Sequence, residues 1–144
     1  MSKLFERKNI LKTKQYFDKF ESICKYEFVE DMDNLFLWHE KVIEDFYKIE
    51  RNEFFPTFSV ENDIDFELLW DKVDNVVNLC SMVFYMKKNG ILVKVEVDKI
   101  KNFVREFFKQ QSSYDACLML LHPNKVVAFC DNEYDVDFLY VSDT

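Results

Sequence analysis

Apolar residues recur at three- and four-residue steps through the first ninety positions, a spacing typical of amphipathic helices. The pattern predicts helices over residues 9–26, 35–51 and 66–89, separated by acidic or proline-containing loops. The third stripe is the most regular and ends at Asn89-Gly90, where a left-handed glycine is expected to stop the helix. These three helices should each pack one face against a common core.

After Gly90 the apolar spacing changes to two, which predicts a half-buried strand over residues 91–97. Helical spacing returns over residues 99–111. Three apolar segments separated by turn-forming residues then indicate a β-meander; they cover residues 116–121, 126–130 and 136–141.

These elements predict an α+β fold. A helical N-terminal half packs against a small, mainly antiparallel C-terminal sheet, and residues 1–144 form a single domain. Residues 1–89 are expected to be mainly helical. Residues 90–144 should supply a strand, a helix and the three-stranded meander.

The first turn of the meander makes a specific prediction about two cysteines. If the turn is centred between Pro123 and Asn124, Cys117 lies directly opposite Cys130. Directly opposed residues have Cβ atoms about 4.5–5.5 Å apart, so the two thiols should be neighbours. The surrounding charges are acidic, which disfavours a reactive thiolate.

Glycine content excludes several kinds of site. The chain has one glycine, Gly90, among 144 residues. Phosphate-binding loops need glycine for close backbone approach, so dinucleotide and P-loop fingerprints are absent. No cofactor is predicted.

Metal-binding and catalytic patterns are also missing. The four cysteines are widely spaced, without a Cys-x-x-Cys pair. His39-Glu40 resembles half of a metalloprotease helix motif, but position 43 is isoleucine instead of the second histidine ligand. We therefore predict neither a metal ligand set nor a catalytic residue.

The start of the chain becomes charged after a few residues and has no apolar core of a signal peptide. No apolar run approaches the roughly 20 residues that span a bilayer. These observations favour a cytoplasmic protein that does not enter membranes.

Charge is unevenly distributed along the chain. The formal net charge is −8, and residues 112–144 carry six acidic residues against one lysine. Residues 52–86 are also acidic, whereas residues 87–111 are basic. Nucleic-acid binding needs a basic face, so direct contact with nucleic acid is disfavoured.

The second acidic block supplies the candidate binding residues. If Asp135 and Asp137 lie in the last strand, alternation places both carboxylates on one exposed face of an edge strand. Acids beside aromatic anchors suit recognition of a basic protein partner. The alternative is an edge strand charged to prevent association between sheets. The candidate partner-binding residues are Asp131, Glu133, Tyr134, Asp135, Asp137 and Tyr140.

These features favour a non-enzymatic acidic binding protein that neutralises a basic protein partner. The most concrete form is a cytosolic immunity protein or inhibitor of a nuclease-type toxin, whose acids cover the cationic groups that hold phosphate. Alternatives are a phage-type nucleic-acid mimic that blocks a DNA-binding defence protein and a small enzyme with an unrecognised site. A fourth possibility is an adaptor that binds through an apolar groove.

Overall fold

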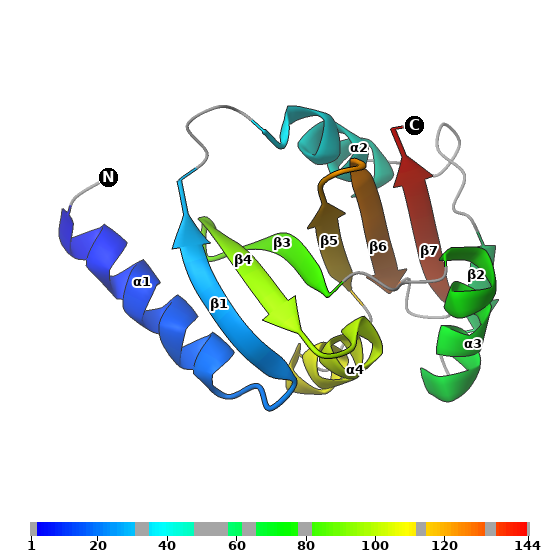
Figure 1. Ribbon diagram of the computed structural model, residues 1–144, viewed down its shortest axis with the longest axis horizontal. Helices are drawn as coiled ribbons and strands as arrows, with labels where there is room; N and C mark the ends of the chain where they lie inside the picture. The colour runs from blue at the N-terminus through cyan, green and yellow to red at the C-terminus, as the bar shows by residue number, and fades with distance from the viewer. Residues whose placement is uncertain are drawn as a thin grey trace.

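Seven strands pair side by side into one antiparallel sheet, in the order β1-β4-β3-β5-β6-β7-β2 (Figure 1). The computed structural model describes residues 3–30, 35–47, 58–61, 66–77, 82–111, 115–131 and 135–143. Within these ranges the strands are β1 (Ile23–Val29), β2 (Phe58–Glu61), β3 (Val83–Lys88), β4 (Ile91–Val97), β5 (Ala116–Leu120), β6 (Lys125–Asp131) and β7 (Asp135–Ser142). The helices are α1 (Lys3–Asp18), α2 (Leu37–Tyr47), α3 (Phe66–Val77) and α4 (Ile100–Gln111).

One face of the sheet carries α1, α3 and α4 over a core rich in aromatic rings. Phe103 of α4 is fully buried, and its ring centroid lies 4.8 Å from that of Phe84 on β3. Phe108 meets Phe129 of β6 edge-to-face at 5.3 Å. Burying a Phe side chain contributes about 2–3 kcal/mol, so α4 anchors both halves of the sheet.

The opposite face is divided into an apolar half and a polar half. Phe46 of α2 packs over Val126, Ala128 and Leu139, which covers the C-terminal strands. Farther along the sheet, β1 and β4 place oppositely charged residues across from each other, with Lys25 opposite Glu96 and Glu27 opposite Lys94. The α+β prediction is therefore confirmed, with helices on both faces of an antiparallel sheet.

The predicted helix over residues 9–26 is wrong in its second half. Helix α1 ends at Asp18, and β1 begins at Ile23. The Glu106 carboxylate accepts hydrogen bonds from the backbone N–H groups of Glu21 and Ser22, at 3.0 and 2.7 Å. These bonds fix the turn after α1 and prevent the helix from continuing.

The predicted helix over residues 66–89 is also wrong in its second half. Helix α3 spans Phe66–Val77, and Val83–Lys88 forms strand β3, which pairs with β4. Asn89 and Gly90 both have positive φ, 54° and 76°, as a type I′ hairpin turn requires. Gly90 therefore closes a hairpin instead of ending a helix, and the N-terminal half supplies three of the described strands.

The strand over residues 91–97, the following helix and the meander are confirmed, but the predicted cysteine pairing is wrong. The first meander turn occupies residues 121–124, so Leu120 opposes Lys125. This register places Cys117 opposite Ala128 and Cys130 opposite Asp137. The two cysteines share a face without being directly opposed.

Candidate functional site

The acidic strand predicted to bind a partner is not at the edge of the sheet. Strand β2 pairs with β7, and Asp137 lies between Ser59 and Cys130 in the register. Asp137 is only 6% exposed to solvent. The prediction of an exposed Asp137 on an edge strand is therefore wrong, because a short strand from residues 58–61 covers that edge.

The remaining candidates that the structure describes do not all share the face of Asp137. Asp131 ends β6, and its N–H donates a 2.7 Å hydrogen bond to Oδ1 of Asp115. Tyr140 is half-buried against the core on the opposite face from Asp137, with Lys125 Nζ 5.8 Å from its ring centroid. Asp135 opens β7 opposite Glu61. Glu133 and Tyr134 lie outside the described residues.

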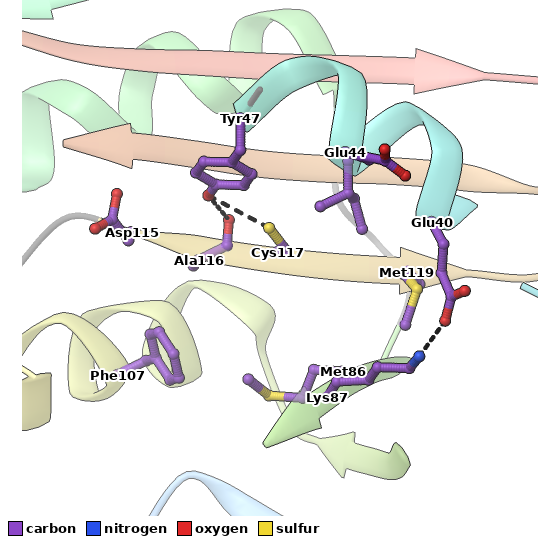
Figure 2. A pocket seen from close by; sticks show the side chains of 11 residues that line it. Glu40, Glu44, Tyr47, Met86, Lys87, Phe107, Asp115, Ala116, Cys117 and Met119 are labelled. Atoms are coloured by element: carbon purple, nitrogen blue, oxygen red, sulfur yellow. Dashed lines mark hydrogen bonds and ion pairs between the residues drawn. The ribbon is translucent and has the colours of Figure 1, made fainter. Parts of the chain in front are cut away.

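A cleft between α2 and the middle of the sheet offers a different candidate site. Among the described residues, the ladder between β3 and β5 consists of a single pair, Tyr85 with Met119. Beyond that pair a cavity of about 410 Å³ opens beside α2 (Figure 2). Its size falls in the range of about 300–1,000 Å³ typical of ligand pockets.

The walls of the cleft are mainly apolar. Met86 of β3, Met119 of β5 and Ile43 of α2 line it, together with Phe107 of α4. Phe107 belongs to α4 on the other face of the sheet, so the lining combines residues from both faces beside the single β3–β5 pair. An unclosed ladder thus produces an apolar recess.

Tyr47 closes one end of the cleft with its hydroxyl group turned inward. The hydroxyl donates to the carbonyl of Phe129 at 2.5 Å and also lies 3.4 Å from the carbonyl of Ala116. It accepts a hydrogen bond from the Cys117 thiol at 3.3 Å (Figure 2). The residue as a whole is still 39% exposed, so much of its surface remains accessible to a ligand.

The thiol of Cys117 and the phenol of Tyr47 at this end are held neutral. Burial raises the pKa of the Cys117 thiol to about 12, against the opposing hydrogen bond to Tyr47. Burial likewise raises the pKa of Tyr47 above its usual value, and the neighbouring Cys117 adds to the shift. A neutral thiol is a poor nucleophile, so this pair suits hydrogen bonding better than nucleophilic attack.

The mouth of the cleft is acidic. Glu40, Glu44 and Asp115 line it, and Lys87 is the one basic residue among the described lining residues. Lys87 Nζ forms an ion pair with Glu40 Oε1, so that its charge is already compensated within the chain (Figure 2). Among the described lining residues, carboxylates therefore outnumber basic groups over an apolar interior.

His39 of α2 is not among the described residues that line the cleft. Its side chain is fully buried, and Nε2 donates a 2.7 Å hydrogen bond to the carbonyl of Leu120. Burial lowers the pKa of His39, although Leu120, Asp143 and Glu40 oppose the shift. Within the described ranges, no group of three His, Cys, Asp or Glu residues is placed to hold a metal ion.

Several cleft residues were not singled out from the sequence as a site. The sequence pattern places Met86 in a helix and predicts no role for Tyr47. The Asn89-Gly90 pair could have revealed the β3–β4 hairpin and the strand position of Met86, because Asn-Gly is a strong hairpin signal.

In comparisons with protein-family models, curated proteins and solved structures, nothing matched the chain. No helix in the described part of the chain is long and apolar enough to cross a membrane. The cleft and its charges are therefore the basis for a functional proposal.

Proposed function

We propose that this protein is a non-enzymatic binding protein that neutralises a basic protein partner through the α2–β5 cleft. The observation that carries the proposal is the acidic mouth of an apolar cleft, in which the lining lysine is already paired with Glu40. Charges of one sign around a recess steer an oppositely charged partner toward it, and apolar walls then hold the complex.

The chemistry of the cleft supports binding in preference to catalysis. Cys117 and Tyr47 are its hydrogen-bonded thiol and phenol, and both have pKa values raised by burial. Neither group is poised to give up a proton near neutral pH. Binding to a partner requires no such group.

A cytoplasmic inhibitor of a nuclease-type toxin is the most concrete form of this function. A nuclease holds its phosphate substrate with cationic side chains, and acids that cover those side chains exclude the nucleic acid. A protein from this class therefore presents the basic surface that the cleft complements. The partner is defined here by that surface chemistry.

The polar half of the sheet argues against a nucleic-acid mimic. A mimic needs carboxylates spaced along one face like phosphates, without interleaved cations. On β1 and β4 each acid lies opposite a lysine, as Glu27 does opposite Lys94, with 3.8 Å between the charged atoms. That face is balanced in charge and suits exposure to water.

Salt-dependent capture from the native lysate tests the proposed function. Wild-type protein should retain a partner of high pI at low salt and release it as salt rises. The variant Glu44→Gln/Asp115→Asn should weaken capture by about tenfold or more, since it removes two carboxylates from the cleft. The matched control is Asp71→Asn/Asp74→Asn, which removes two exposed acids from α3.

The two variants have the same net charge, so general electrostatics affects both equally. Equal weakening by the α3 control would show that the interaction has no localised site. Full retention by the cleft variant would remove the cleft from the interface.

A further inference from the structure

We infer that strand β1 is a dimer interface, at which a second copy of this chain adds its own β1 in antiparallel pairing. The two sheets would join edge to edge, related by a two-fold axis that passes through the sheet at Tyr26. The interface is separate from the proposed function, because β4 lies between β1 and β3, the strand that lines the cleft.

The outer edge of β1 has no strand beside it among the described residues. β1 stands at one end of the sheet order and pairs there with β4 alone. Such an edge presents unpaired backbone N–H and C=O groups that can pair with another chain. Natural sheets often protect an edge by making its strand short, as with β2 at the other end, which has four residues. β1 has seven residues and no proline, so it lacks this protection.

Helix α1 covers a face of the sheet and leaves this edge accessible. Tyr26 of β1 points to α1, where its ring centroid lies 5.4 Å from that of Phe17 and its hydroxyl group donates a 2.5 Å hydrogen bond to Asp18. The helix also reaches the end of β3, whose Lys88 carbonyl lies 3.4 Å from Thr13 Oγ1. α1 therefore crosses over β4 from β1 toward β3, on one side of the sheet.

The side chains of β1 are largely exposed. Lys25 and Glu27 are exposed on the face away from α1, and Phe28 is 37% exposed on the α1 side. Helix α1 also exposes Ile10 and Leu11, at 43% and 56%. An open edge strand with exposed apolar side chains is a site of association between chains.

Charge selects one register for a pairing of β1 with itself. In a two-fold antiparallel pairing centred on Tyr26, Lys25 lies opposite Glu27 of the second copy, and Glu27 lies opposite the second Lys25. A pairing centred on Lys25 or on Glu27 would instead set two like charges against each other. Opposite charges directly across a ladder stabilise it, and like charges destabilise it. The sequence of β1 is therefore complementary to itself in the Tyr26-centred register.

The new pairs would extend a row of alternating charge that the chain already contains. Lys94 of β4 lies opposite Glu27, with 3.8 Å between the charged atoms, and Glu96 lies opposite Lys25. Across the joined edge, each row would run lysine, glutamate, lysine, glutamate. Glu27 would keep Lys94 as its neighbour and gain a second lysine, which its 54% exposed side chain can accommodate. No ion pair within the chain needs to break.

The self-association of the wild-type protein is the first test. β1 bulges at Cys24, between Ile23 and Lys25, so the regular ladder is short. A small interface predicts a weak dimer, with a dissociation constant of about 1–100 μM. Sedimentation velocity over a range of concentrations measures this constant. Wild-type protein that is still monomeric at about 1 mM would overturn the interface.

Reversal of one edge charge tests the register. Lys25→Glu sets like charges across both new pairs and should weaken dimerisation by about tenfold or more. The matched control is Lys94→Glu, which has the same net charge and also sets an acid opposite an acid within the chain, but lies on β4 away from the edge. The control should dimerise like the wild type. Equal weakening of two folded variants, or none with Lys25→Glu, would overturn the interface.

A mixture of two complementary variants tests the same register by rescue. Lys25→Glu and Glu27→Lys should each be largely monomeric, and together they should form heterodimers because the acids of one strand oppose the lysines of the other. Both variants remain acidic overall, since the wild-type net charge is −8, so overall charge does not attract them. Native mass spectrometry with one variant labelled with heavy nitrogen counts the heterodimers. Their absence from a mixture of folded variants would overturn the register.

Hydrogen exchange locates the interface. The backbone amides of Ile23–Val29 should exchange more slowly in concentrated than in dilute protein, because edge pairing protects them. A dimer without this protection would overturn the inference. Partner capture is a separate measurement: a β1 dimer that captures no basic protein would support the interface and overturn the proposed function, and capture by a monomeric wild type would do the reverse.

Discussion

The hydroxyl group of Tyr47 donates a 2.5 Å hydrogen bond to the main-chain carbonyl of Phe129, and so ties the end of α2 to strand β6. The thiol of Cys117 donates to the same hydroxyl. One side chain therefore connects the helix to two strands at the end of the cleft.

Removing this hydroxyl should destabilise the protein. Tyr47→Phe leaves the Phe129 carbonyl and the Cys117 thiol without this partner, and we expect the free energy of unfolding to fall by about 1–2 kcal/mol. Urea denaturation measures the difference. Tyr26→Phe is the control, because its hydroxyl bonds Asp18 at the surface and should matter less. Equal losses for the two variants would contradict a special role for Tyr47.

Gly90→Ala should weaken the β3–β4 hairpin. Nothing lies within 4 Å of a Cβ added at Gly90, so the cost comes from the positive φ of 76°. A residue with a Cβ loses about 1–2 kcal/mol in this conformation. Thermal unfolding should show the loss, and Gly90→Asn should show a smaller one because asparagine tolerates the left-handed region better. An unchanged melting temperature for Gly90→Ala would contradict the hairpin turn.

Cys117 should resist alkylation in the folded protein. Burial raises the pKa of its thiol to about 12, whereas Cys24 is exposed. The pKa of Cys24 is also raised, by its hydrogen bond to Asp98, so accessibility decides the order of reaction. Iodoacetamide followed by peptide mass spectrometry should find Cys24 modified first, and both modified in denaturant. Early modification of Cys117 would show that the cleft opens more widely than the structure indicates.

Stability should decrease as the solution becomes mildly acidic. Burial holds the pKa of His39 below its unfolded value of about 6.5, so the unfolded chain binds a proton more readily. The contribution of neutral His39 is complete above that pH and is lost as pH falls below it. His39→Gln should flatten this part of the pH profile measured by chemical denaturation. An unchanged profile for folded His39→Gln would contradict the assignment to His39.

The C-terminal half of the fold could be read from local patterns. Alternation identified Ile91–Val97, helical spacing identified α4, and apolar segments between turns identified the meander. In each of these elements the spacing of apolar residues follows the side of the helix or strand that is buried. Local information was sufficient because each segment packs according to its own pattern.

The N-terminal half could not be read in the same way. Val83 and Phe84 continue the three- and four-residue spacing of α3, although they belong to strand β3. The end of α1 depends on Glu106, which lies more than eighty positions away in the sequence. Such tertiary contacts override local periodicity, and the pattern alone does not contain them.

The candidate site failed for a topological reason. Alternation does not reveal whether another strand adds beside β7, and β2 does so with only four residues. That addition places Asp137 inside the sheet. The cleft lies where β3 and β5 are joined by one ladder pair among the described residues. Local periodicity cannot reveal this pairing, because β3 ends at Lys88 and β5 begins only at Ala116.

The single rung between Tyr85 and Met119 divides the sheet into two blades. One blade contains β1, β4 and β3, and the other contains β5, β6, β7 and β2. Among the described residues one ladder pair couples them, so the packing of α4 against Phe84 of one blade and Phe129 of the other supplies much of what holds the two together. The width of the gap beside that rung therefore depends on side-chain packing more than on strand pairing.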